Sequence, residues 1–220
     1  MIEIDSLSKH FLLPDTSYLK VFDTMNITID TGDFVAIMGQ SGQGKTTFLN
    51  ILSGLERNYT GSVKVLGKKL EELSESEITS FRGRHISYVF QDYNLIDSLT
   101  VEENIELILD INKLSRRYSI DDILSIVGLS SKKKSYPIEL SGGEKQRVAL
   151  ARSFIGRSDI ILADEPTGSL DEGNARRVMV LLKQLWKETG CTIIMITHSE
   201  DIAYFAESQY ILRDRQLIKK

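Results

Sequence analysis

Residues 34–54 read FVAIMGQSGQGKTTFLNILSG, and this stretch carries the strongest structural signal in the chain. Its apolar start, Phe34–Met38, predicts a short buried strand, and the glycines that follow predict a tight loop. Helical character over Lys45–Ser53, ended by Gly54, predicts a helix directly after the loop. Strand, glycine loop and helix in this order indicate an α/β fold with parallel strands.

The loop itself, residues 39–47, reads GQSGQGKTT and fits the phosphate-loop pattern G-x-x-x-x-G-K-[ST]. Glycines let the backbone close around an anion, and the N–H groups at the following helix start attract phosphate. Lys45 is expected to reach the β- and γ-phosphates of a nucleotide, and Thr46 to place its hydroxyl on Mg²⁺. Gln43 replaces a more usual small residue and is expected to alter loop packing. The predicted nucleotide contacts are Gly39, Gln40, Ser41, Gly42, Gln43, Gly44, Lys45, Thr46 and Thr47.

A second candidate site lies where the apolar run Ile160–Ala163 ends in two acids, Asp164 and Glu165. A buried carboxylate is costly unless it faces a cation, so Asp164 is predicted to bind Mg²⁺ directly or through water. Glu165, placed beside a γ-phosphate, is suited to accept the proton of an attacking water. No N-K-x-D guanine reader follows, so the sequence favours hydrolysis of ATP.

The remaining pattern predicts how the chain is organised. Alternation at Ile2–Leu7 and Ile27–Ile29 predicts two peripheral antiparallel strands, and residues about 92–156 read as a helical insert. After the insert, strands alternate with helices, including a helix over Asp201–Ala206. The sequence therefore predicts a single domain over residues 1–220: an α/β nucleotide-hydrolase core with a mostly parallel sheet, an antiparallel β-subdomain and a helical subdomain.

Composition and charge exclude several classes of protein. The chain has 220 residues, 41% hydrophobic and 26% charged, with a net charge of −4, so no overall attraction to nucleic acid is expected. No apolar run approaches the roughly 18 to 20 residues of a membrane span, and the first residues lack the pattern of a signal peptide. A cytoplasmic location is expected. The single Cys191 lies in an apolar stretch and reads as a core residue.

Residues 140–147 read LSGGEKQR, which resembles the signature motif of the ABC ATPases. Ser141, Gly142 and Gly143 stand at the start of a helix predicted over Glu144–Ile155, so they offer a second set of N–H donors to a phosphate. The resemblance implies that Ser141 to Glu144 close on ATP held by a second copy of the chain. An ATP-dependent homodimer with two sandwiched nucleotides is therefore expected.

Other family motifs follow in order along the chain. The resemblance implies that Gln91 contacts Mg²⁺, that Ser169–Asp171 crosses to the partner with Asp171 near its nucleotide, and that His198 contacts the γ-phosphate. It assigns catalysis to Lys45, Glu165 and His198, and the metal to Thr46, Gln91 and Asp164. The aromatic residue expected to stack on adenine matches Phe11, with Tyr18 as its competitor.

The subgroup is indicated by ADEPTGSLD at residues 163–171, which resembles macrolide-efflux and lipoprotein-release ATPases, and by DYNLIDSLT at residues 92–100, which resembles bacitracin-type peptide exporters. The resemblance implies an ATPase subunit held at the inner face of the cell membrane by a permease on a separate chain. Its cargo is expected to be antimicrobial peptides, macrolide-like compounds or lipoproteins. An ABC ATPase without a transport role, of the division or cluster-assembly type, is the alternative. The apolar residues Tyr93, Leu95, Ile96 and Leu99 either meet the permease or pack the helical insert.

Overall fold

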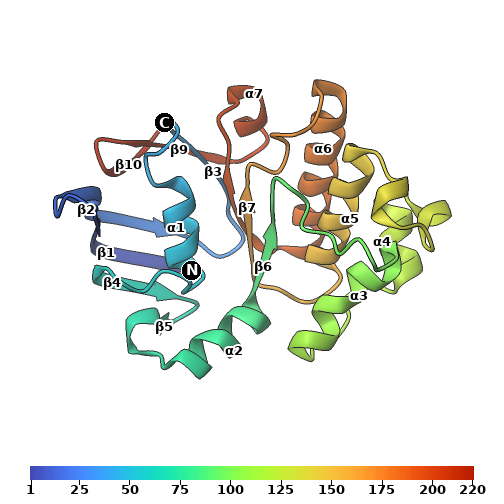
Figure 1. The fold of residues 1–220 in the computed structure, drawn as a ribbon, viewed down its shortest axis with the longest axis horizontal. Helices are drawn as coiled ribbons and strands as arrows, with labels where there is room; N and C mark the ends of the chain where they lie inside the picture. The colour runs from blue at the N-terminus through green and yellow to red at the C-terminus, as the bar shows by residue number, and fades with distance from the viewer. The chain divides into compact units, whose positions relative to one another are not determined.

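The computed structural model describes all residues from Met1 to Lys220, and Figure 1 traces the chain through them. The chain forms two compact units. Unit 1 consists of Met1–Arg82 and Ile194–Lys220, and unit 2 consists of Gly83–Ile193. Helix α2 (Glu75–His85) and strand β8 (Thr192–Ile196) each contribute residues to both units.

One part of unit 1 is an antiparallel sheet with the strand order β2-β1-β4-β5. Its strands are β1 (Ile2–Leu12), β2 (Tyr18–Ile29), β4 (Thr60–Val65) and β5 (Lys68–Lys69). The predicted antiparallel pair is confirmed, but both strands extend well beyond their apolar alternation. The register between them shifts three times from Ile4 to His10, and Ser6 and Thr24 adopt left-handed φ values of 54° and 47°. Such bulges let paired strands continue where regular alternation has ended.

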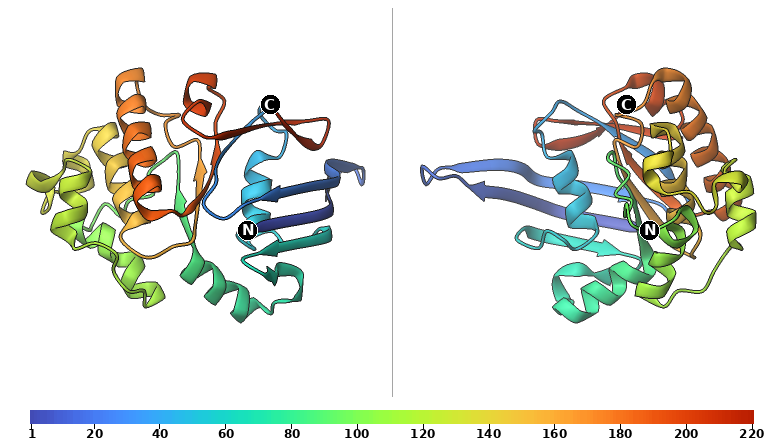
Figure 2. Two further views of the ribbon diagram at one scale, coloured as in Figure 1. Left: turned by 180° about the vertical axis from the view of Figure 1, so that it is seen from behind. Right: turned by 45° about the vertical axis from the view of Figure 1, so that its right-hand side comes forward.

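The phosphate-loop pattern lies in the other part of unit 1. Strand β9 (Ser208–Arg213) pairs in parallel with β3 (Phe34–Met38) and antiparallel with β10 (Gln216–Lys219). Every residue of β3 is buried, as its apolar sequence predicts. Helix α1 (Lys45–Leu52) lies beside the four-stranded sheet in Figures 1 and 2, and its Phe48 ring meets that of Phe22 edge-on, with centroids 6.2 Å apart.

The predicted helix over residues 201–206 is too long. Helix α7 (Glu200–Ala203) is a single turn, and a 3₁₀ turn, η1 (Leu70–Glu72), also belongs to unit 1. Beyond α7, the N–H groups of Phe205 and Ala206 each donate to the carbonyl three residues earlier, at 3.1 Å. This tighter winding ends the helix and leads the chain into β9.

Unit 2 combines a parallel strand pair with a group of helices. Strands β6 (Ile86–Val89) and β7 (Ile160–Asp164) pair in parallel. The helices are α3 (Val101–Asn112), α4 (Ile120–Ile126), α5 (Gly142–Phe154) and α6 (Glu172–Thr189), with 3₁₀ turns η2 (Ser130–Lys132) and η3 (Pro137–Glu139). Helices α3 and α6 both pack against α5. None of the helices is long and apolar enough to cross a bilayer.

Candidate functional site

The loop between β3 and α1 requires glycine for steric reasons. Gly44 has a φ of 100° and caps α1, and a Cβ added there would lie 2.1 Å from Cγ1 of Val21. A Cβ on Gly39 would lie 2.9 Å from the carbonyl oxygen of Leu212. Both contacts are closer than any side chain tolerates, so β2 and β9 enclose the loop too tightly for a larger residue. The backbone is thus held close to the start of α1, as a phosphate cradle requires.

The side chain of Lys45 folds back onto this loop. Its side chain is buried, and Nζ donates hydrogen bonds to the carbonyl oxygens of Gly39 at 2.8 Å and Gln40 at 2.9 Å. The ammonium therefore lies against the concave side of the loop, next to the N-terminus of α1. A buried ammonium together with a helix N-terminus forms a strongly anion-attracting pocket wall. Thr46 is on the first turn of α1 and is exposed.

Gln43 shapes the same loop, as its unusual identity suggested. Its Oε1 accepts a hydrogen bond from the backbone N–H of Gln40 at 2.8 Å, and it lies 2.7 Å from where a Cβ on Gly39 would be. The side chain thus braces the loop from Gly39 to Gln43. A small residue at this position would leave the N–H of Gln40 without that partner.

His198 emerges at the edge of the sheet from which the loop departs. The N–H of Thr197 donates to the carbonyl of Ile37 in β3 at 3.2 Å, and the loop begins two residues after Ile37. His198 follows directly and is exposed. Side chains at the carboxyl ends of adjacent parallel strands meet at one edge, where ligands bind in α/β sheets. The structure thus brings His198 to the edge that carries the phosphate loop.

The two candidates for adenine stacking project from opposite faces of one hairpin. Phe11 pairs with Leu19 and Tyr18 pairs with Leu12, so the two aromatic rings occupy alternate positions of the β1–β2 ladder. Lys9 Nζ lies 4.3 Å from the centroid of the Phe11 ring, whereas the Tyr18 ring contacts His10 edge-on at 5.0 Å. Only one of the two rings can therefore face a given base at this hairpin.

The acidic residues lie in unit 2, at the end of β7. Asp164 is the last residue of the strand, and Glu165 follows in a left-handed conformation with a φ of 46°. This conformation is uncommon for a residue with a side chain and turns Glu165 away from the strand direction. A Cβ on Gly168 would lie 3.3 Å from Oε2 of Glu165 and 3.2 Å from Cδ of Gln91. The structure therefore gathers Glu165 and Gln91 around Gly168, a residue that the sequence analysis did not single out.

The signature residues are held by a capping box. The Glu144 carboxylate accepts hydrogen bonds from the backbone N–H of Ser141 at 2.8 Å and from its hydroxyl at 2.9 Å, and these bonds lower the pKa of Glu144. Helix α5 consequently starts at Gly142, two residues before the predicted start. The N–H groups of Gly142 and Gly143 therefore lie in the first turn, where intrahelical acceptors are absent.

A hydroxyl network joins the segment after Gln91 to the signature. Ser169 Oγ donates to the carbonyl of Gln91 at 3.2 Å and is hydrogen-bonded to the Tyr93 hydroxyl at 3.0 Å. A Cβ on Gly142 would lie 2.9 Å from that same hydroxyl. Tyr93 itself has a left-handed φ of 62°, and Arg152 in α5 donates to its carbonyl at 2.8 Å. Half-buried Tyr93 is thus part of an internal network, whereas its neighbour Ile96 is exposed.

Asp171 is connected to the signature residues through the side chain of Asn174. Its carboxylate accepts hydrogen bonds from the Asn174 backbone at 3.0 Å and from the Asn174 side chain at 2.6 Å, which lower the pKa of Asp171. A Cβ on Gly143 would lie 2.8 Å from Oδ1 of the same asparagine. Asn174 was not predicted as a site residue, because its contact with Gly143 joins the first turns of α5 and α6, which are remote in sequence.

Comparison with known proteins agrees with this arrangement. A family model described as ABC transporter matches residues 22–168. The bacitracin export ATP-binding protein BceA of Halalkalibacterium halodurans is 41% identical, over 90% of this chain and 79% of its own length. The macrolide export ATP-binding/permease protein MacB of Mannheimia succiniciproducens is 39% identical, over 99% of this chain and 34% of its own length. The chain thus spans about a third of MacB.

The solved structures agree as well. The dimeric post-hydrolysis state of the ATP-binding cassette MJ0796, bound to ADP and Pi, superposes with a TM-score of 0.87 at 34% identity, covering 100% of this chain and 98% of that one. The fold and motifs define an ATP-binding cassette with the α/β fold of the phosphate-loop hydrolases, as predicted. The chain belongs to the ABC transporter family. It is an ATPase of that family, and its predicted kinship with the bacitracin and macrolide exporter group is confirmed.

Proposed function

We propose that two copies of this chain close on two ATP molecules and thereby drive a separate membrane permease. The observation that supports this proposal is that one short chain has two helix N-termini suited to bind phosphate. One is the start of α1 at Lys45, and the other is the start of α5 after Ser141. A single ATP has no need of both. The relatives are described as bacitracin and macrolide export proteins, and MJ0796 as a dimer, which supports this assembly and an antimicrobial peptide or macrolide-like compound as cargo.

In this proposal Lys45 and the loop N–H groups bind the β- and γ-phosphates. Thr46, Asp164 and Gln91 are the ligands proposed for Mg²⁺, which neutralises phosphate charge when bound. No group of three His, Cys, Asp or Glu side chains forms a metal cage in the structure. That fits Mg²⁺, because this ion typically binds one or two carboxylates and completes its shell with water and phosphate.

For hydrolysis we assign the base to Glu165 and a γ-phosphate contact to His198. The left-handed backbone at Glu165 supports this assignment, because strained conformations of this kind concentrate where a side chain must be aimed. Gly168 leaves room beside the carboxylate. Ser141, Gly142, Gly143, Glu144 and Asp171 are proposed to meet the ATP of the second copy.

The permease is proposed to dock on the turn that carries Ile96, which is 42% exposed. This turn is rigid because the buried Asn104 side chain bonds both the N–H and the carbonyl of Ile96, at 2.7 and 3.0 Å, and the carbonyl of Leu99 at 2.9 Å. A rigid apolar turn is a suitable docking point for a partner element. Docking there would hold the protein at the inner face of the cell membrane.

The docking proposal is tested by co-purification of the chain with multi-helix membrane proteins from its native membrane. Ile96→Asp is expected to reduce recovery of the complex at least about tenfold, since a charge in an apolar interface costs more than about 1.4 kcal/mol. Ile111→Asp is the matched control, because Ile111 is 67% exposed on α3 and outside that turn. Hydrolysis that proceeds with no membrane partner in either form would favour the ABC ATPase without a transport role.

The adenine contact has its own test. Phe11→Ala is expected to weaken ATP binding about 5- to 150-fold, since stacking on a base is worth about 1–3 kcal/mol. Tyr18→Ala should leave affinity within about twofold, because Tyr18 lies on the opposite face of the hairpin. Isothermal titration of both variants with ATP decides between them. The reverse ranking would assign the stacking role to Tyr18.

A further inference from the structure

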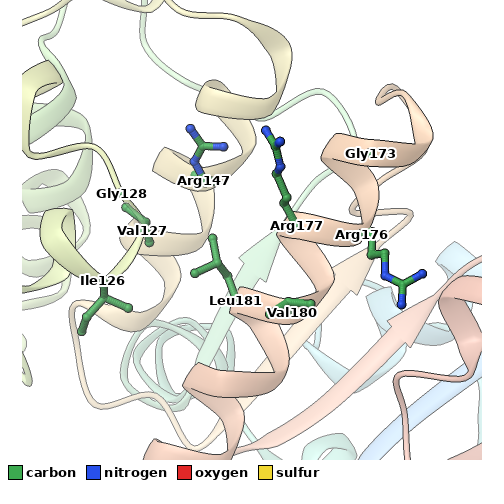
Figure 3. A pocket seen from close by; sticks show the side chains of 9 residues that line it. All are labelled: Ile126, Val127, Gly128, Arg147, Gly173, Arg176, Arg177, Val180 and Leu181. Carbon is green, nitrogen blue, oxygen red and sulfur yellow. The ribbon is translucent and has the colours of Figure 1, made fainter.

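Unit 2 contains an open groove of about 610 Å³ (Figure 3), and of the motifs above only LSGGEKQR contributes to it, through its last residue, Arg147. Its apolar wall comes from Ile126 and Val127 at the end of α4 and from Val180 and Leu181 on α6. The remaining lining residues include three arginines, Arg147 of α5 and Arg176 and Arg177 of α6. The volume lies within the range of small-molecule sites, which is about 300–1,000 Å³.

Helix α6 packs one side against the core and lines the groove with another side. Its core face is formed by Ala175, Val178, Met179, Leu182, Leu185 and Trp186, all buried. The groove residues Arg177, Val180 and Leu181 recur at helical spacing on a different side, and Val180 is 52% exposed. An exposed valine between an arginine and a leucine is an apolar surface that the fold itself leaves uncovered.

Arg147 and Arg177 make no hydrogen bond within the chain, although the charge of Arg147 helps to lower the pKa of Glu144 after the bonds from Ser141. The chain has 31 acidic and 27 basic residues, yet neither Arg147 nor Arg177 forms a hydrogen bond or ion pair. The Nε atom of Arg147 is buried and unsatisfied. Glu144, one turn away on α5, accepts its hydrogen bonds from Ser141. The other nitrogens of the Arg147 guanidinium are not among the buried unsatisfied atoms, so an anionic ligand that bonds them compensates the arginine charge.

Figure 3 shows how charge and apolar surface are distributed along the groove. The guanidinium groups of Arg147 and Arg177 point the same way at one end, and the side chains of Leu181, Val127 and Ile126 lie towards the other. Arg176, next in sequence, points away from the pair. A ligand that satisfies both ends carries an anionic head and an apolar tail.

We propose that this groove binds an amphipathic anion, a carboxylate or phosphate head on Arg147 and Arg177 with an acyl-like tail along Val127, Val180 and Leu181. A free fatty acid and an anionic lipid share this chemistry. The proposal goes beyond the ATPase function and does not depend on it, because no residue of the groove belongs to the phosphate loop or to the end of β7.

The test is isothermal titration of the full chain with decanoate, in saturating Mg²⁺ and ADP so that the phosphate loop is occupied. One saturable site is expected in the unaltered protein. Arg177→Gln should weaken binding about tenfold or more, because a charged hydrogen bond to the head is lost. Arg176→Gln, the same change one residue earlier, should stay within about twofold. Equal effects of the two variants, or no saturable site in the unaltered protein, would overturn the proposal.

A second variant and two further ligands complete the experiment. Val180→Asp places a like charge in the groove at an exposed position and should abolish decanoate binding with the thermal unfolding temperature unchanged. Decyl glucoside has the tail without the anion and should not bind; binding of equal strength would refute the role of the arginines.

Competition between decanoate and vesicles of anionic lipid distinguishes the two sources of the ligand. Displacement of decanoate by the vesicles identifies a membrane lipid, and no displacement identifies a free acid. An acidic helical peptide that binds through Arg177 where decanoate does not would instead make the groove a protein-docking surface and sink the proposal.

Discussion

Lys45→Ala is expected to abolish tight ATP binding. The ammonium is buried and fixed by the carbonyls of Gly39 and Gln40, so it is preorganised for phosphate and has no substitute among its neighbours in the loop. Loss of a charged hydrogen bond of this kind costs about 3 kcal/mol, which corresponds to a factor of about 150 in affinity. Isothermal titration with ATP measures the change directly.

Because the same bonds brace the loop, the variant needs a folding control. Thermal unfolding of Lys45→Ala should show the same single transition as the unaltered protein. Lys69→Ala, which removes an exposed lysine paired with Glu72, should leave ATP affinity unchanged. Unchanged affinity in Lys45→Ala would refute the assignment of the phosphate loop.

Glu165→Gln is expected to retain ATP binding and to lose hydrolysis by at least about two orders of magnitude, since a general base contributes about 10²–10⁴ to the rate. The amide keeps the shape of the side chain but does not accept the proton of water. ATP should therefore accumulate on the variant, and the ATP-bound form should elute as a dimer in size-exclusion chromatography with light scattering. The unaltered protein with ADP should elute as a monomer.

Ser141→Arg in the Glu165→Gln background tests where the second contact lies. Ser141 caps α5, and an arginine there places a bulky side chain where the phosphate of the partner is proposed to dock. The double variant should bind ATP and remain monomeric. A dimer that persists in the double variant, or one that never forms in Glu165→Gln even with the permease present, would rule out the sandwich mechanism.

The sequence predicts best where a single segment determines its own structure. Strand β3 was predicted with the observed ends, because it is an uninterrupted run of buried residues between Asp33 and Gly39. The phosphate-loop pattern is equally local because it is one contiguous stretch, although the steric need for Gly39 and Gly44 comes from β9 and β2. The extension of β1 and β2 was missed, because it depends on bulges that apolar alternation does not encode.

Interactions between remote segments were not predictable from one sequence. The start of α5 was predicted two residues too late, at Glu144. Ser141 is the N-cap of the helix, so Gly142 and Gly143 already belong to its first turn. Asn104 and Tyr93 carry no local signal for the bonds they make to residues in other segments. Roles at the nucleotide, the metal and the partner, as well as the single domain over residues 1–220, stay predictions.

The serine at the start of the Ser169–Asp171 segment mechanically links three parts of unit 2. One oxygen, Ser169 Oγ, is bonded both to the carbonyl of Gln91 and to the hydroxyl of Tyr93, and that hydroxyl is wedged against Gly142. Three stretches that are far apart in sequence therefore meet at one pair of hydroxyl groups. A displacement of the residues after Gln91 would have to break these contacts or carry the start of α5 and the segment before α6 with it.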